Sequence, residues 1–513
     1  MDFAIARETI TTNENVYKGN VQQAIDCDIT LPEYCPDILR ILKCQLIPRT
    51  SSHSLNGDRL TIDGSALLRI LYIDETEAAV HSYEQICPFS KSVDINNSVS
   101  GDAIVELDCD IEYVNCRAVN QRRVDINGSV NIKISISAMK EKHILSSASG
   151  NGIQIRTDNI ESLTVKGFAQ KTITVDETLE LSRSDYAVAQ LIRYNGDVIL
   201  TDVKIITNKL LIKGDLVIKM LYTADDKSRK IESISHTLPI SQIIDVDGID
   251  DTDKCKVTLK LTSLDMSLRS DSNGELRQAD VVAKISVSAF SAQNVNLQVI
   301  NEAYSIKCAL ETEKQNMQFV SLADSINDVF LFRGAIDVAS VGINDIIDMW
   351  VNSITSNASV DDKRVKIFGN ISLSLLVIDA SNQAAYLERQ VEFETSYELN
   401  EVYSDTKYDI NINVNAIDYI VHGSDKVDIR IELKIEADVY KLCKKNVVVR
   451  LDADEMSKVL LSPCALTIYF CDENESVWDI AKKYNTTVEA IMSENELECE
   501  IITRPCMLMI PSV

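Results

Sequence analysis

The feature that most constrains this chain is an internal repeat of about 150 residues. A first landmark reads GSALLRILY at 64–72, GDLVIKMLY at 214–222 and GNISLSLLV at 369–377. A second landmark follows in the same order, as KISISAM at 133–139, KISVSAF at 284–290 and KIEADVY at 434–440. Two landmarks that return together in one order predict three tandem copies of one folding unit.

Each copy of the first landmark alternates apolar and polar residues. Ala66, Leu68 and Ile70 fall on one side of a strand, and Arg69 falls on the other, because successive side chains of a strand point to opposite faces. The pattern predicts antiparallel sheets with one core face and one partly solvated face. We therefore expect a mainly β fold in which each copy forms a β-sandwich.

A chain of 513 residues is too long for a single hydrophobic core, so we predict four domains. Three are β-rich copies at 1–157, 158–308 and 309–458. The fourth is a small module at 459–513.

The last fifty residues do not continue the repeat. Two β-prone runs, at 466–470 and 507–510, enclose two short segments with helical period. Val477, Ile480 and Tyr484 stack on one face of the first segment, because residues three and four apart lie on the same side of a helix. The predicted order is strand, helix, helix, strand, which is a small α+β fold.

This module resembles a LysM domain, a βααβ fold that binds N-acetylglucosamine polymers. The resemblance rests on four places: SVWDIA at 476–481, YNTTV at 484–488, Asn495, and Ile510-Pro511.

Two loops depart from the LysM pattern. Asn474-Glu475 and Pro505 stand where such domains usually carry glycine. The segment also holds nine acidic residues against three basic ones. These departures favour a protein partner, and peptidoglycan stays the alternative ligand.

The first copy contains a double-proline segment, LPEYCPDILRIL at 31–42. Pro36 predicts the first turn of a short helix there, because proline suits that position. The segment resembles the signature of the SPOCS domain of spore coat proteins. Tandem SPOCS copies followed by one LysM domain resemble the SipL-like family of spore coat morphogenetic proteins.

That resemblance implies a partner and a place. The partner is the coat ATPase stage IV sporulation protein A, with other coat proteins as further candidates. The place is the mother-cell cytoplasm at the forespore surface, in the spore coat.

The composition of the chain argues against several classes of partner and location. A net charge of −27 argues against nucleic acid, because phosphate contacts would form in a repulsive field. Residues 1–20 lack the apolar core of a secretory signal, and no apolar run is long enough to span a bilayer. Thirteen cysteines without a C-x-x-C pair fit reduced thiols in a cytosol.

No catalytic or cofactor motif emerges. The five histidines are dispersed, and no phosphate-binding glycine loop exists. We predict a non-enzymatic protein without a metal or cofactor.

The predicted partner-binding residues are Leu466, Trp478, Ile480 and Lys482. Trp478 lies at the edge of the apolar helix face, so we expect a half-exposed indole that anchors a partner. Lys482 offers a charge beside it. Packing within the module is the alternative for Trp478, and a solvated helix face is the alternative for Lys482. The leading hypothesis is a scaffold of spore coat assembly; the alternative is a peptidoglycan-binding protein of the spore cortex or envelope.

Overall fold

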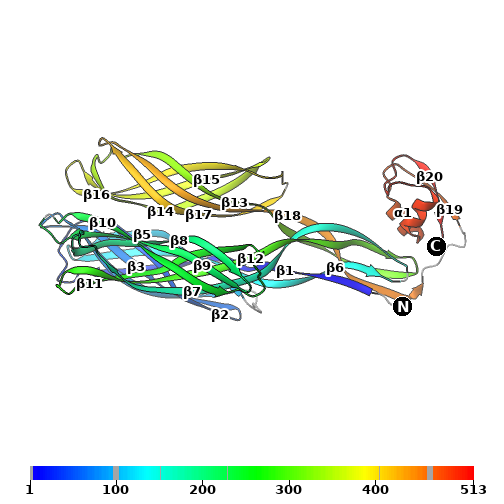
Figure 1. The fold of residues 1–513 in the computed structure, drawn as a ribbon, viewed down its shortest axis with the longest axis horizontal. Helices are drawn as coiled ribbons and strands as arrows, with labels where there is room; N and C mark the ends of the chain where they lie inside the picture. Colours follow the sequence, from blue (N-terminus) through cyan, green and yellow to red (C-terminus); the bar gives the residue numbers. More distant parts are fainter. Residues whose placement is uncertain are drawn as a thin grey trace.

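The computed structural model describes residues 4–95, 103–150, 152–227, 229–403, 405–458 and 466–512. These residues form three sets of six strands and a small C-terminal module (Figure 1). The prediction of a mainly β fold built from antiparallel sheets is confirmed.

The first repeat is a sandwich of two three-stranded sheets. One sheet has the order β1-β6-β5, from β1 (Ala4–Thr30), β6 (Arg123–Ser149) and β5 (Ala103–Ala118). The other has the order β2-β3-β4, from β2 (Ile38–Asn56), β3 (Arg59–Asp74) and β4 (Val80–Asp94). Apolar residues of both sheets, among them Leu46, Leu68 and Ile132, form one core between them.

The second and third repeats follow the same plan. Repeat 2 contains β7 (Ile153–Glu180), β8 (Val188–Ile206), β9 (Lys209–Ala224), β10 (Ile231–Asp245), β11 (Cys255–Ser270) and β12 (Leu276–Ser305). Repeat 3 contains β13 (Cys308–Asp337), β14 (Ile343–Asp361), β15 (Arg364–Asp379), β16 (Ala384–Glu398), β17 (Thr406–His422) and β18 (Lys426–Lys458). The predicted boundary at 157 falls inside β7, and 459 lies outside the described residues. The division into domains stays a prediction.

The predicted helix at the double-proline segment is wrong. Residues 31–37 form turns, and Ile38 begins β2. The reason is that the residues from Ile38 on pair with β3, which uses their backbone groups in a sheet. The Arg122 guanidinium holds the loop before them, because it donates to the carbonyls of Leu31, Pro32 and Cys35.

The first and last strands of each repeat extend beyond its sandwich and pair as a ribbon. The three ribbons lie together in one arm of the molecule, which we call the stalk (Figure 1). Its core takes Ile10 and Ile144 from the first ribbon, Leu297 from the second, and Phe319 and Val447 from the third. The long strands thus join the three repeats along their length.

The sandwiches also meet one another through the outer faces of their β2-β3-β4-type sheets. Leu71, Leu221 and Leu376 hold the same position in the three repeats, and all three are buried in one cluster with Trp350. We call this cluster the junction. The expected solvated face is therefore absent from the middle of these strands, because each repeat covers the others.

The C-terminal module contains β19 (Leu466–Cys471), α1 (Val477–Tyr484), α2 (Val488–Glu494) and β20 (Cys506–Pro511). β19 and β20 pair antiparallel. The Thr487 side chain accepts a hydrogen bond from the Ala490 N–H and so caps α2. The predicted order of strand, helix, helix and strand is confirmed, and Figure 1 shows the module at the tip of the stalk.

Candidate functional site: the C-terminal module and its seat

The module has its own small core. The apolar faces of both helices pack on the inner face of the two-stranded sheet, with Val477, Ile480, Ile491 and Leu508 among the buried residues. Ile480 is only 4% exposed. It therefore holds the module together, and a partner does not reach it in this arrangement.

The module sits on the end of repeat 2. Tyr304 and Ile306, which lie at and just beyond the end of β12, belong to the same buried cluster as the module's core. The Tyr304 ring meets the Trp478 indole edge to face, with ring centres 4.9 Å apart. The Tyr304 hydroxyl donates to the Thr486 carbonyl at 2.8 Å, and burial raises the pKa of Tyr304. We call this contact the seat.

Trp478 is buried, which corrects the expectation of a half-exposed indole. It is 4% exposed, and its Nε1 donates to Glu302 Oε2 at 2.6 Å. The covering residues come from a distant part of the chain, so helical periodicity alone did not reveal them. Lys482 is exposed, as the solvated-face alternative expects.

Glu302 is the charged member of the seat. Burial raises the pKa of its carboxyl, but hydrogen bonds from Lys314 and Trp478 and the positive charges of Lys314 and Lys482 hold that pKa below its usual value. The Lys314 ammonium lies 3.2 Å from Glu302. The carboxylate is therefore the favoured state, and it orients the indole.

The outer face of the small sheet is apolar and exposed. Leu466 is 43% exposed, Ile468 57% and Phe470 77%, and these three residues occupy every second position of β19, on one face of the strand. Met507 lies opposite Phe470 on β20 and is 54% exposed. We call these four residues the apolar strip. Of these four residues only Leu466 is predicted from the sequence, although the alternation at 466, 468 and 470 also indicates Ile468 and Phe470.

The loop at 472–476 keeps the turn that a glycine would supply. Asn474 has a φ of 69°, a left-handed conformation that asparagine tolerates better than most residues. Its N–H donates to the Ile502 carbonyl at 2.8 Å. The Glu475 carboxylate accepts a hydrogen bond from the Tyr469 hydroxyl at 3.1 Å. A hydrogen bond thus joins the two loops that depart from the LysM pattern, and the Glu475 carboxylate lies beside them.

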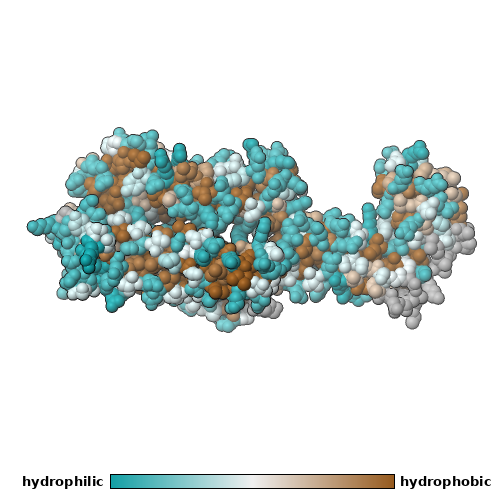
Figure 2. All heavy atoms as spheres, viewed as in Figure 1, coloured by the Kyte–Doolittle hydropathy of each residue, from teal (hydrophilic) through white to brown (hydrophobic). Residues whose placement is uncertain are grey.

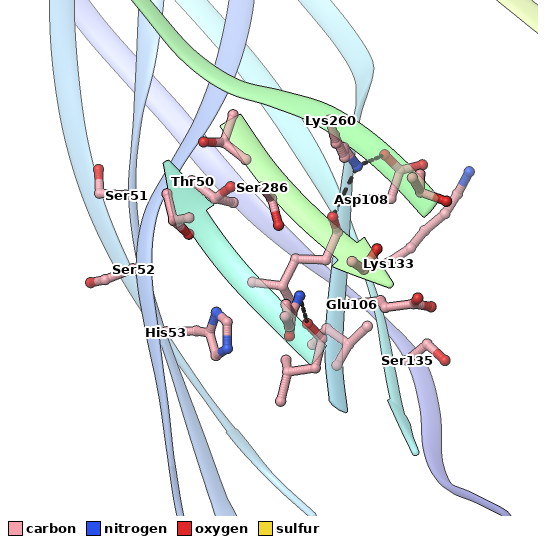
Figure 3. Close-up of a pocket in the computed structure, with 18 of the residues that line it drawn as sticks. Thr50, Ser51, Ser52, His53, Glu106, Asp108, Lys133, Ser135, Lys260 and Ser286 are labelled. Atoms are coloured by element: carbon pink, nitrogen blue, oxygen red, sulfur yellow. Dashed lines mark hydrogen bonds and ion pairs between the residues drawn. The ribbon is translucent and has the colours of Figure 1, made fainter. Parts of the chain in front are cut away.

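A second feature, missed by sequence analysis, is a cleft of about 860 Å³ between repeats 1 and 2 (Figure 3). Its lining includes Thr50, Ser51, Ser52, His53, Glu106, Asp108, Lys133, Ser135, Lys260 and Ser286. Lys260 crosses the cleft to Asp108 at 2.5 Å and to the Leu107 carbonyl at 3.0 Å. Burial lowers the pKa of His53, which favours its neutral form. The cleft offers hydroxyl and ammonium groups, and its residues come from too many strands for a linear motif.

Hydrophilic residues cover much of the visible face of the repeats, with apolar patches between them (Figure 2). Within the described ranges, no helix is long and apolar enough to cross a membrane.

Comparison with known families agrees with this arrangement. Residues 37–119 and 187–269 match the family model described as SipL, SPOCS domain, and residues 473–502 match the LysM domain. No curated protein and no solved structure matches the chain. The two SPOCS matches begin just before β2 and β8 and end just after β5 and within β11. The third set of strands lies outside the SPOCS matches.

Both families consist of non-catalytic binding domains, so the matches support a sporulation-related protein whose last domain is of the peptidoglycan-binding type. The recognition made from the sequence is confirmed: two regions of the chain match the SPOCS domain of SipL, and one region near the C-terminus matches the LysM domain.

Proposed function

We propose that this protein is a non-enzymatic scaffold of endospore coat assembly, which acts in the mother-cell cytoplasm at the forespore surface. Its LysM domain docks onto a coat ATPase of the stage IV sporulation protein A type. The observation that carries the proposal is the apolar strip, because exposed apolar patches on a small domain favour a protein partner.

The strip supplies both apolar area and free strand edges. β19 and β20 form a two-stranded sheet in the described part of the chain, so each strand has an edge to which a partner strand can add. The domain around it is acidic, which favours a partner surface with basic residues. Among the residues proposed from the sequence, Leu466 contacts the partner directly, Lys482 offers a charge, and Trp478 and Ile480 maintain the domain and its seat.

The test is capture of the purified ATPase by the full chain. An Ile468→Ser, Phe470→Ser variant should lose capture by about tenfold or more, because central apolar anchors carry most of an interface's free energy. Ile243→Ser is the matched control, since Ile243 is an apolar residue on β10 that is 57% exposed. Equal capture by the strip variant and the wild type, with both folded by circular dichroism, would contradict the proposal.

The second candidate is a peptidoglycan-binding protein of the spore cortex or envelope. The left-handed turn at Asn474 and the LysM match favour it. Sedimentation with insoluble peptidoglycan separates the two functions. Retention that survives the strip variant, together with absent ATPase capture by the wild type, would favour the glycan.

A further inference from the structure

Six of the described cysteines lie in three contacting pairs. In the LysM domain, Cys471 and Cys506 are cross-strand partners of β19 and β20, and their sulfur atoms are 3.3 Å apart. Cα atoms of opposed residues in antiparallel strands are about 4.5–5.5 Å apart. That spacing lies within the range of about 4.4–6.8 Å that a disulfide needs.

The other two pairs lie in repeat 1. Cys27 of β1 interacts with Cys87 of β4, and Cys44 of β2 interacts with Cys116 of β5; Cys44 belongs to the core of repeat 1, and the other three pack against it. β1 and β4 flank one edge of the sandwich, and β2 and β5 flank the other. Each pair therefore joins the two sheets, at opposite edges of the same core.

Repeats 2 and 3 lack these pairs. The positions of Cys44 and Cys116, defined by their strand partners, hold Tyr194 and Met266 in repeat 2 and Met349 and Tyr419 in repeat 3. The positions of Cys27 and Cys87 hold Glu177 and Leu238 in repeat 2 and Gly334 and Val391 in repeat 3. A core position that simply needs an apolar side chain takes other residues elsewhere, so paired thiols are a property of repeat 1.

We propose that these three pairs are disulfide sites, at which a peroxide closes intramolecular bridges that staple repeat 1 and the LysM sheet. This modification goes beyond the scaffold function and does not depend on its partner.

The chemistry balances with one peroxide for each pair. One thiol loses its proton and its sulfur attacks a peroxide oxygen, which breaks the O–O bond and gives a sulfenic acid and one water. The second sulfur then attacks the sulfenic sulfur, an S–S bond forms, and a second water leaves. Each pair loses two protons and two electrons, which the peroxide takes up as it is reduced to two waters.

Every pair offers the oxidant at least one partly exposed sulfur, namely Cys27, Cys87, Cys116 or Cys506. The hydrogen bond from Cys44 lowers the pKa of Cys116 against the opposing effect of burial, so the Cys116 thiolate is the attacking sulfur of its pair. Burial raises the pKa of Cys27 to about 12, with Cys87 adding to the shift. Its thiol is protonated at neutral pH, so Cys27 is not the sulfur that attacks the peroxide there.

The experiment treats the folded, reduced full chain with hydrogen peroxide, then measures intact mass and maps the non-reduced peptides. Three bridges lower the mass by about 6 Da, about 2 Da each, and link 27 to 87, 44 to 116, and 471 to 506 in a monomer. The melting temperature rises by several degrees and returns after reduction.

Cys116→Ala should lose only the bridge to Cys44, and Cys506→Ala, in the other domain, should lose only the bridge to Cys471. Cys499→Ala is the control, because Cys499 is exposed and lies in none of the three pairs; it should keep all three bridges. Circular dichroism of each reduced variant verifies its fold. Scrambled links, oxygen adducts on unlinked paired cysteines, or an unchanged mass loss in both pair variants would overturn the proposal.

Discussion

The junction of the three repeats and the seat of the LysM domain are two contacts built on different principles. At the junction, Asp348 is buried and accepts from Arg193 at 2.8 Å and from Lys219 at 2.5 Å. The Arg193 guanidinium also lies 3.8 Å from the centre of the Trp350 ring. The seat, by contrast, combines one aromatic pair and buried Ile306 with two hydrogen bonds and the ion pair between Glu302 and Lys314.

The junction shows how diverged repeats fix their arrangement. Lys43, Arg193 and Asp348 hold the same position in repeats 1, 2 and 3, because each pairs with an equivalent leucine. Like charges at all three positions would repel, whereas the acid in repeat 3 binds the arginine in repeat 2. Burial lowers the pKa of Arg193 to about 10, against the opposing effect of Asp348. The junction therefore depends on compensation between buried charges, whereas the ion pair at the seat, between Glu302 and Lys314, is partly exposed.

The largest effect is expected at Asp348. Asp348→Ala leaves Arg193 buried without its partner and removes the acceptor of Lys219, which should cost about 3–5 kcal/mol. The measurement is the urea midpoint of the full chain. Asp202→Ala is the control, because Asp202 forms an exposed ion pair with Lys213, and such pairs contribute about 0–1 kcal/mol. Equal midpoints for the two variants would remove the distinction between the junction and an ordinary surface contact.

The second-largest loss of stability is expected at the seat, and it should be confined to the residues around the seat. Tyr304→Ala removes the ring that covers Trp478, and loss of a buried aromatic side chain costs about 3–5 kcal/mol. We expect faster hydrogen exchange in α1 and a red shift of Trp478 fluorescence, with unchanged exchange in the sandwich strands. Tyr304→Phe is the matched control, since it loses only the bond to Thr486, worth about 1 kcal/mol. Faster exchange throughout repeat 2 would show that the seat supports the repeat itself.

Local pattern was enough to predict the strands, the repeat and the βααβ order, because alternation and helical period are properties of neighbouring residues. It was insufficient for register. In repeat 1, Lys133 pairs with Asn20. In repeat 2, the residue that matches Asn20 is Gln170, and it pairs with Ser288 and not with Lys284, which matches Lys133 in the sequence. A shift by an even number of residues keeps every side chain on its face, so alternation cannot detect it.

Burial by residues that are distant in the sequence was the other feature that local pattern could not predict. The sequence around Trp478 predicted a surface anchor because no residue near it indicates that Tyr304 covers the indole. The outer face of β3 looked solvated because its cover comes from repeats 2 and 3. Both errors have one cause: burial between distant segments leaves no periodic signal in either segment.

A smaller effect is expected from acid. The pKa of Glu302 lies below its ordinary value of 4.5 in the folded protein, so its stabilising contribution is complete above that value. The contribution is lost as the pH falls through the folded pKa. Trp478 fluorescence should shift in that range before the repeats unfold. Glu302→Gln should abolish this acid-dependent step and cost about 1 kcal/mol at neutral pH. An unchanged acid shift in that variant would mean that another group controls the seat.

The smallest effect on stability is expected at the apolar strip, and it separates docking from packing. Phe470→Ser should change the free energy of unfolding by about 0.5 kcal/mol or less, because Phe470 is 77% exposed. Ile480→Ala should cost about 2–5 kcal/mol, because Ile480 belongs to the core. Urea unfolding and ATPase capture, measured on both variants, distinguish the two roles. Capture lost in the stable Phe470 variant places the partner on the strip, whereas capture lost only in the Ile480 variant reports unfolding and leaves the strip without a partner.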